Sequence, residues 1–369
     1  MKIVYSFILK ANLITLNTKL RLKFKMYQYL FKPLLFKLPP ELSHTLSLKG
    51  LAAANALNLI KYLHSQPYRE RTLMGLKFTN PVGLAAGLDK NGDYIDALAS
   101  LGFGFIEIGT VTPKAQSGNP KPRLFRIPKE QALINRMGFN NQGIDYLLQR
   151  VQKARYRGIL GINIGKNAST PIEEAVQDYL ICLQAAYSYA SYITVNISSP
   201  NTRGLRTLQH GSFLEELLTA LKHEQQVLAA QYQKQVPLVV KIAPDLDQAE
   251  IIELADTLRR FAVDGIIATN TTLSRSGMSA CPKSQETGGL SGLPLAAQST
   301  EVLRILRQEL QGKIPLIASG GIMNAEIAQQ KFDAGADLIQ LYTGLIYQGP
   351  QLIKACLARA GIPLPQNKL

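Results

Sequence analysis

The sequence predicts an α/β protein, a (β/α)8 barrel preceded by a small helical extension at the N-terminus. From residue 78 onward, short apolar runs rich in β-branched residues alternate with stretches of helical periodicity, such as 213–231 and 247–261. Apolar strands that alternate with helices are typical of a buried parallel sheet. Eight such units favour a closed barrel over an open, doubly wound sheet. We expect the strands at residues 82–86, 104–108, 159–164, 192–197, 237–242, 264–268, 315–318 and 337–341.

The composition narrows the class of protein. The chain has 369 residues, 46% of them hydrophobic, with 41 Lys or Arg against 26 Asp or Glu and a net charge of +15. These values exclude a disordered chain and a polytopic membrane protein. The basic excess favours contact with phosphates, of a nucleic acid or of an anionic lipid. The chain has three widely spaced cysteines and no CxxC pair: Cys182, Cys281 and Cys356. This spacing argues against disulfides and a cysteine-built metal site, and it favours a reducing compartment.

We divide the chain into residues 1–25, 26–65 and 66–369. The first segment carries six basic residues and no acidic residue. It is a poor secretory signal, because Lys10 interrupts its apolar run. Its uninterrupted apolar stretches are also too short to span a membrane. An organelle presequence stays open as an alternative. Because Met26 begins a new compact segment, we favour an optional extension or a start site called too early.

Residues 26–65 predict two helices. The segment MYQYLFKPLLFKL (26–38) is rich in aromatic residues and leucine, and Pro39-Pro40 separate it from a second helix over 41–63 with leucines at helical spacing. Such a pair is able to cap the barrel. It is equally able to lie on a membrane with its apolar face down and its lysines at the headgroups. The near absence of acidic residues favours the membrane.

Polar and small residues follow the predicted strands at the end where a barrel carries its active site. The seventh and eighth strands end in Ser319-Gly320-Gly321 and Tyr342-Thr343-Gly344. Small residues at these two strand ends let backbone N–H groups approach a phosphate. A lone Gly-Gly is common in turns, but the two sets together indicate a phosphate site.

Four asparagines lie at the same predicted face: Asn135, Asn196, Asn201 and Asn270. Each amide offers a donor and an acceptor, which matches the N–H and C=O edge of a pyrimidine or a flavin ring. Any one of them is also an ordinary turn residue, except Asn196, which lies inside a strand run.

Lys241 stands inside an otherwise apolar strand, VVKIA. A buried lysine needs an anionic partner, because an isolated buried charge is costly. Two partners fit: the negative charge of a reduced flavin ring, or a salt bridge to Asp245 or Asp89.

Ten motifs in order resemble class 2 dihydroorotate dehydrogenases over about residues 26–360: NPVGLAAGLDKNG (80–92), IEIGTVTP (106–113), GNPKPRLFRIP (118–128), LINRMGFNNQG (133–143), ITVNISSPNTRGLR (193–206), KIAPDL (241–246), ATNTT (268–272), GGLSG (288–292), ASGGI (318–322) and LYTGLIYQGP (341–350). The resemblance implies an FMN barrel enzyme that oxidises (S)-dihydroorotate to orotate in de novo pyrimidine synthesis. In that family a base removes the C5 proton, hydride passes from C6 to flavin N5, and a membrane quinone takes the electrons.

The resemblance also implies residue roles. Ser199 matches the catalytic base, whereas class 1 relatives use a cysteine; a serine hydroxyl needs activation to act as a base. The FMN set is Ala86, Gly87, Leu88, Asp89, Lys90, Thr110, Asn163, Asn196, Lys241, Thr269, Gly292, Gly321, Tyr342 and Thr343. The substrate set is Lys90, Asn135, Arg136, Met137, Gly138, Phe139, Asn196, Asn201, Asn270 and Thr271. Lys90 supplies a cation for the substrate carboxylate, and loop 198–210 is a candidate lid.

The quinone side depends on His44, Arg126 and Tyr342. The resemblance implies a bacterial monomer held peripherally at the cytoplasmic face of the inner membrane by residues 26–65. Two other functions stay open. An FMN barrel that reduces tRNA uridines fits the basic charge, although that family uses a cysteine base and carries an RNA-binding extension, so we expect no nucleic-acid partner. The other is a barrel without catalysis that serves as a basic adaptor.

Overall fold

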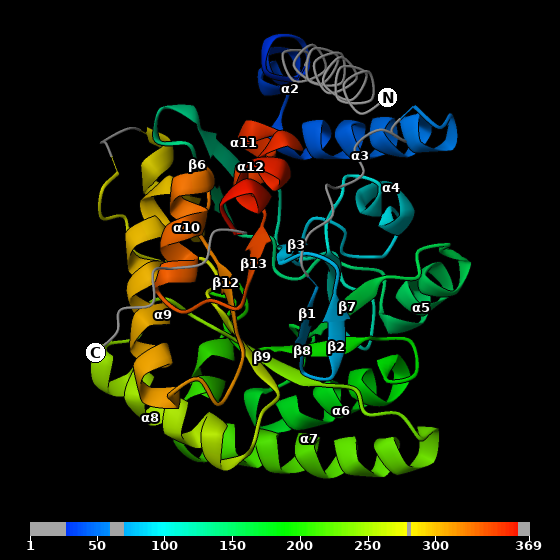
Figure 1. Cartoon of the computed structure of the whole chain (residues 1–369), viewed down its shortest axis with the longest axis vertical. Coiled ribbons are helices and arrows are strands. Elements are labelled where there is room, and N and C mark those ends of the chain that lie inside the picture. Colours follow the sequence, from blue (N-terminus) through cyan, green and yellow to red (C-terminus); the bar gives the residue numbers. More distant parts are fainter. Residues whose placement is uncertain (1–26, 60–69, 279–281, 361–369) are drawn as a thin grey trace, which may run out of the picture.

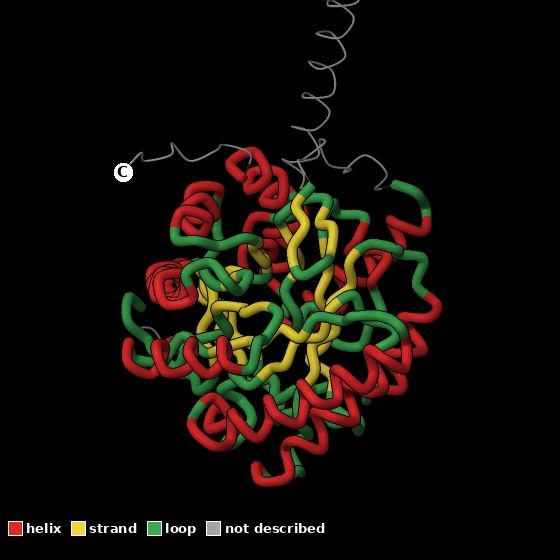
Figure 2. Tube along the Cα trace, turned by 60° about the horizontal axis from the view of Figure 1, so that its bottom comes forward, coloured by secondary structure: helices red, strands yellow, loops and turns green. Residues whose placement is uncertain are grey.

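The computed structural model describes residues 27–59, 70–278 and 282–360. Eight parallel strands close into a barrel in the middle of the molecule, and helices surround them (Figures 1 and 2). All eight predicted strands are present, which confirms the predicted fold class. In order around the barrel they are β3 (Val82–Leu84), β4 (Phe105–Val111), β7 (Ile159–Ile164), β8 (Tyr192–Asn196), β9 (Leu238–Ile242), β10 (Gly265–Ala268), β12 (Leu316–Ser319) and β13 (Leu338–Leu341), which pairs back to β3.

The outer helices bury one apolar stripe against the barrel. In α8 this stripe includes Ile251, Leu254 and Leu258, and a capping box between Asp247 and Glu250 fixes where the helix begins. The predicted helices 213–231 and 247–261 appear as α7 and α8. The helices that follow β3 to β13 are α4 (Ile95–Ala99), α5 (Ile144–Lys153), α6 (Ala175–Ala186), α7 (Gly211–Tyr232), α8 (Gln248–Arg260), α9 (Ala296–Leu310), α10 (Ala325–Asp333), α11 (Thr343–Gln348) and α12 (Gln351–Ala360).

Two small sheets close the ends of the barrel, and the sequence pattern did not reveal either. A hairpin of β1 (Arg71–Leu73) and β2 (Leu76–Phe78) covers the amino end, where the Phe78 and Phe105 rings meet edge to face at 5.2 Å. At the carboxyl end, β5 (Leu124–Ile127), β6 (Ala132–Asn135) and β11 (Gly289–Gly292) form an antiparallel sheet in the order β11-β6-β5. This second sheet supplies part of the cleft described below.

The N-terminal segment folds as a π-helical turn η1 (Tyr27–Phe31), α2 (Lys32–Lys37) and α3 (Pro40–Ala56), which lie beside α11 and α12 at one end of the molecule (Figure 1). The Tyr27 hydroxyl donates to the Ile346 carbonyl (2.5 Å), and the Phe36 and Tyr347 rings meet edge to face at 5.3 Å. The second helix is shorter than the predicted 41–63. It ends at Ala56, and Asn58 has a left-handed φ of 58°, which a continuing helix does not allow.

Several expectations fall on other parts of the chain. Residues 1–25, residues 60–63 of the predicted second helix, and Cys281 lie outside the described residues. Cys182 and Cys356 are free thiols buried in the core. In the described part of the chain, no helix has both the length and the apolar character needed to cross a membrane.

Candidate active site

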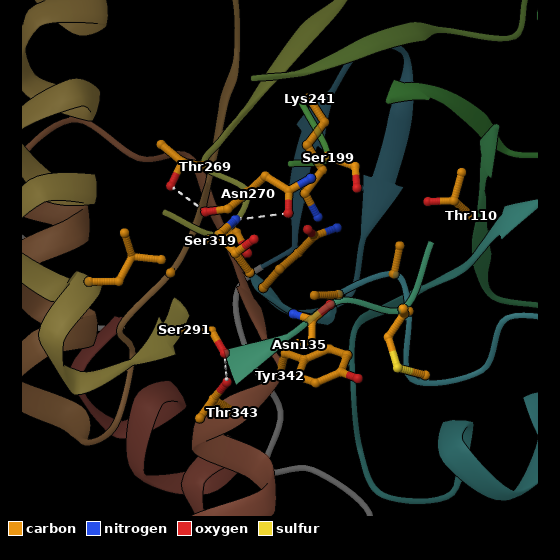
Figure 3. Close-up of a pocket in the computed structure, with 18 of the residues that line it drawn as sticks. Thr110, Asn135, Ser199, Lys241, Thr269, Asn270, Ser291, Ser319, Tyr342 and Thr343 are labelled. Carbon is orange, nitrogen blue, oxygen red and sulfur yellow. Dashed lines mark hydrogen bonds between the residues drawn. The ribbon is translucent and has the colours of Figure 1, made fainter. Parts of the chain in front are cut away.

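A cleft opens at the carboxyl ends of the barrel strands, where the sequence places its polar residues (Figure 3). Seven barrel strands contribute to it directly or through the loops that follow them, and β6 and β11 cover one side. Its lining is Ala85, Ala86, Gly87, Lys90, Thr110, Asn135, Met137, Gly138, Phe139, Asn196, Ser199, Asn201, Lys241, Thr269, Asn270, Thr271, Ser291, Gly292, Leu295, Ser319, Gly320, Gly321, Ile322, Gln340, Tyr342, Thr343 and Gly344.

Two adjacent serines follow β8, and their hydrogen bonds distinguish them. The Ser198 hydroxyl donates to Asn196 Oδ1 (3.1 Å) and accepts from Asn270 Nδ2 (3.0 Å), so it is fully engaged. Ser199 lines the cleft, and its Oγ accepts only the backbone N–H of Asn201, at 3.3 Å. The hydroxyl proton of Ser199 has no acceptor within the described part of the chain. Ser199 is therefore the serine that is free to act on a bound molecule.

The cleft asparagines are linked to one another. Asn270 Nδ2 donates to Asn196 Oδ1 (3.3 Å), and Asn201 Nδ2 donates to Asn135 Oδ1 (3.1 Å). These bonds fix the orientation of each amide and leave part of each hydrogen-bonding capacity for a ligand. Below them, Asn163 is fully buried; its Oδ1 accepts from Thr110 Oγ1 (2.6 Å).

Lys241 makes neither of the salt bridges considered from the sequence. Asp245 pairs with Arg206 (2.7 Å), and Asp89 accepts two backbone N–H groups, from Asp93 and Tyr94. Within residues 27–59, 70–278 and 282–360, no hydrogen-bond or ion-pair partner contacts Lys241 Nζ. Burial lowers the pKa of Lys241, and the Glu107 carboxylate opposes that shift. A buried cation facing a cleft without a partner fits an anionic ligand.

Glu107 forms a polar layer beneath the cleft that the sequence pattern did not predict. It is fully buried inside the barrel and accepts hydrogen bonds from Asn163 (2.8 Å), Tyr192 (2.9 Å) and Gln340 (2.7 Å). Tyr192 lies on β8 and Gln340 on β13, which are each two strands away from β4 in opposite directions around the barrel. The Glu107 carboxylate therefore links several strands beneath the site. The only signal in the sequence is a glutamate inside the apolar strand run FIEIG.

Lys90 follows β3 and lines the cleft. Burial lowers its pKa to about 8, and the nearby Arg123 adds to this, while Glu41 and Asp89 act in the opposite direction. Burial likewise raises the pKa of Asp89 to about 6. Asp89 does not line the cleft; its bonds to the N–H groups of Asp93 and Tyr94 (3.0 and 2.7 Å) shape the loop that carries Lys90.

The loop after β12 has the geometry of an anion cradle. Gly320 and Gly321 have left-handed φ values of 112° and 74°, and their backbone N–H groups have no acceptor among the described residues. A Cβ at Gly321 would come within 2.3 Å of Ala296 Cα, so glycine is required there. Beside the loop, Ser291 Oγ and Thr343 Oγ1 lie 2.8 Å apart at the opposite end of the cleft from Ser199 and Lys241 (Figure 3).

A ring system with a phosphate tail fits these features. Thr271 Oγ1 and Gln340 Oε1 line the cleft, are buried, and find no partner in the described residues. Together with Lys241 they are orphaned polar groups that a bound heterocycle would satisfy, while the Gly320-Gly321 loop takes the phosphate. No group of three His, Cys, Asp or Glu side chains able to hold a metal occurs in the described part.

Most residues predicted for FMN, the substrate and the base line the cleft, but four do not. Leu88 is in the core, Asp89 and Asn163 support residues that line it, and Arg136 points away from it. Arg136 pairs with Glu286 (2.6 Å) and stacks on the Phe125 ring. The residue sets that the resemblance implies omit eight lining residues: Ala85, Ser291, Leu295, Ser319, Gly320, Ile322, Gln340 and Gly344. The pattern of strand ends does predict three of these, Ser319, Gly320 and Gly344, as part of the phosphate site.

The three residues expected at the quinone side have different environments. Arg126 is buried and donates to the carbonyls of Leu35 (3.0 Å) and Leu38, with Phe36 stacked on its guanidinium. It therefore fastens the end of α2 to β5. His44, on α3, has its pKa lowered to about 4 by burial and by Lys90. Tyr342 lines the cleft itself.

The loop at 198–210 covers one edge of the cleft and contains the short helix η4 (Leu205–Gln209). Arg206 fastens it: its guanidinium donates to the carbonyls of Ser198 (3.0 Å) and Thr271 (2.9 Å) and pairs with Asp245 (2.7 Å).

A closed β/α barrel with a partner-poor lysine, an available serine and an anion cradle at its strand ends has the architecture of a barrel enzyme with its site at the carboxyl ends of the strands. The family model for dihydroorotate dehydrogenase matches residues 68–359. The chain belongs to this family. It is 59% identical over 333 residues to "Dihydroorotate dehydrogenase (quinone)" of Acinetobacter baylyi, covering 90% of this chain and 99% of that protein. It is 58% identical over 332 residues to the protein of the same name from Chromobacterium violaceum, covering 90% and 96%.

Solved structures agree with this assignment. The ligand-free DHODH of Eimeria tenella superposes with a TM-score of 0.79 at 39% identity, covering 87% of this chain and 93% of that one. The structure of the Eimeria tenella enzyme in complex with ferulenol gives a TM-score of 0.78 at 37% identity, covering 87% and 90%. The chain is thus an oxidoreductase of the quinone-dependent dihydroorotate dehydrogenase class.

Proposed function

We propose that this protein oxidises (S)-dihydroorotate to orotate with a quinone as electron acceptor, through bound FMN, and that Ser199 is the base. The observation that carries the proposal is the convergence of Ser199, Lys90 and Lys241 in one cleft with a row of oriented asparagines. Family membership favours this activity over uridine reduction in tRNA and over a barrel without catalysis.

The substrate end of the cleft lies around Ser199. Lys90 takes the dihydroorotate carboxylate, because it lines the cleft without an ion-pair partner in the described residues and Lys241, the other such lysine, serves the flavin. Asn135, Asn201 and Asn270 hold the ring through their donor and acceptor amides. Ser199 accepts the C5 proton through a lone pair of Oγ while its own hydroxyl proton, which has no acceptor in the described residues, passes to solvent in the cleft.

FMN fits the remaining part of the cleft. When bound, FMN would supply a hydride acceptor next to C6 and an electron donor for the quinone. Lys241 lies where it can balance negative charge on the flavin ring, and Thr110 and Asn196 present polar atoms to its edge. The N–H groups of Gly320 and Gly321, with Thr343, hold its phosphate.

The N-terminal helix pair, α2 and α3 with the preceding turn η1, forms the side of the protein that contacts the quinone and the membrane. Its surface carries exposed apolar side chains, among them Tyr29 (77% exposed), Leu34 and Leu46, with Lys37 and Lys49 also exposed. Large apolar side chains bordered by lysines fit the headgroup region of an anionic bilayer. This supports peripheral attachment at the cytoplasmic face of a bacterial inner membrane, with His44, Arg126 and Tyr342 along the path of the quinone.

An anaerobic absorbance experiment tests the proposal. Purified protein is expected to be yellow, to bleach on addition of dihydroorotate, and to regain its colour with a short-chain quinone but not with fumarate or NAD. A yellow protein that keeps its colour with dihydroorotate would overturn the substrate assignment. Colour recovery with fumarate or NAD would overturn the quinone class.

A further inference from the structure

A buried lysine behind the anion cradle is not used by the chemistry above. Lys331, on α10, has no exposed surface, although lysine is among the residues least often fully buried. Its Nζ donates to Ser299 Oγ (2.6 Å) and to the Ala296 carbonyl (3.1 Å). Both acceptors are uncharged groups in the first turn of α9.

No carboxylate balances this charge in the described residues. On α10 itself, Glu326 pairs with Arg359 of α12, and Asp333 accepts from Gln329. Next to the helix, Asp337 lies 3.7 Å from Arg307 of α9. Burial alone lowers the pKa of Lys331, to about 7, with no charged group acting on it. A buried ammonium in that position is unfavourable unless a ligand supplies the anion.

The geometry connects Lys331 to the cradle through one intervening group. Ser299 Oγ accepts from Lys331, and its single proton lies within reach of the carbonyls of Leu295 (2.8 Å) and Gly320 (3.0 Å). Ala296, whose carbonyl is the other acceptor, packs closely against Gly321. A Cβ on Gly321 would lie only 2.3 Å from the Ala296 Cα. The ammonium therefore stands behind the two glycines that line the cleft and whose N–H groups have no acceptor in the described residues.

We propose that Lys331 is the buried counter-charge of the flavin's phosphate group: it acts through space on the phosphate held at Gly320-Gly321 and positions that loop through Ser299. This rests on the proposed binding of FMN. The phosphate carries close to two negative charges near neutral pH, and the low dielectric between the two groups strengthens their attraction. The alternative is a purely structural role in which Lys331 ties α10 to α9.

A comparison of the affinities for FMN and for riboflavin, which lacks the phosphate, distinguishes the electrostatic role of Lys331 from the structural one. The full-length protein is stripped of flavin, and its dissociation constants for FMN and for riboflavin are measured by quenching of flavin fluorescence. Lys331→Met keeps most of the side-chain volume and removes the charge. It is expected to weaken FMN binding on the order of tenfold to hundredfold and riboflavin binding less than about threefold. Equal losses for both flavins, or no loss, would overturn the proposal.

Two further variants make the result decisive. Ser299→Ala keeps the lysine but removes the hydroxyl that links it to Gly320. We expect a smaller loss of affinity that is still selective for FMN. An unchanged ratio of the FMN and riboflavin affinities would count against the proposal, and this test holds even where Lys331→Met fails to fold. Lys354→Met removes an equal charge from a half-buried lysine on α12 and is expected to change neither affinity more than about threefold. A selective loss in this control would show a general charge effect instead. If the unaltered protein does not prefer FMN to riboflavin, the proposed cofactor itself is wrong.

Discussion

In the proposed substrate site, the charge state of Lys90 is expected to set how tightly the free enzyme holds the carboxylate of dihydroorotate or orotate. Its pKa, lowered to about 8 by burial and by Arg123, means that about nine-tenths of the molecules carry the ammonium at pH 7 and about one-tenth at pH 9. Anion binding needs the ammonium. Orotate affinity is therefore expected to be constant well below pH 8 and to fall about tenfold between pH 7 and pH 9.

Removing the charge should have a larger effect. Breaking one partner of a buried ion pair costs about 2–5 kcal/mol, which is roughly 30-fold to several thousandfold in affinity. Lys90→Gln is expected to weaken orotate binding within that range and to abolish the tenfold pH dependence, because the cation assigned to the carboxylate no longer titrates. The measurement is the equilibrium perturbation of flavin absorbance by orotate from pH 6 to pH 9.

Lys121→Gln is the matched control. Lys121 lies 3.5 Å from Glu41, which also acts on Lys90, but its own side chain is 70% exposed. An exposed pair of this kind contributes about 0–1 kcal/mol, so the dissociation constant should change by less than about fivefold and keep its pH dependence. The reasoning is refuted if orotate binding to the unaltered protein is independent of pH between 7 and 9, or if Lys90→Gln keeps the same slope.

Three other predictions follow from the site and the helix pair. Ser199→Ala should slow bleaching of the flavin by dihydroorotate by about 10²–10⁴-fold in stopped-flow absorbance while leaving orotate binding nearly unchanged; a loss below threefold would reject Ser199 as the base. Arg126→Ala leaves the α2 carbonyls unpaired and should slow flavin reoxidation by quinone but spare reduction by dihydroorotate, so equal losses in both half-reactions would contradict it. Leu34→Ser with Leu46→Ser should weaken sedimentation with anionic vesicles at least about tenfold, and Ile252→Ser on α8 should not; equal binding by all forms would remove the helix pair as the membrane contact.

The sequence predicts the barrel well because its signals are local. Each strand is a short apolar run between turn residues, and the parallel topology alone brings the strand ends to one face. That is why the sequence alone predicts that Ser199, Asn270 and Tyr342, which are far apart in the chain, meet in one cleft. The family resemblance added the roles, which the pattern of residues does not contain.

The sequence says less where long-range pairing decides. The β5-β6-β11 sheet joins segments about 150 residues apart, with Leu290 opposite Ile134, so no local pattern marks it. A glutamate in a strand run does not reveal whether it faces the barrel interior, and Glu107 does. Arg126 reads as a ligand-binding residue in the sequence, whereas its two hydrogen bonds to α2 become visible only once the helix pair is folded against β5.

Lys90, Lys241 and Lys331 share a property that the charge count of the chain conceals. Each is withdrawn from water, burial lowers the pKa of each, and none forms an ion pair within the described residues. Buried cations without an ion-pair partner oppose folding on their own, and anions bound at this end of the barrel would offset that cost. The proposed ligands supply one anion for each: the substrate carboxylate at Lys90, the reduced ring at Lys241 and the phosphate at Lys331. Part of the binding free energy of flavin and substrate is therefore relief of charge that the folded chain itself carries.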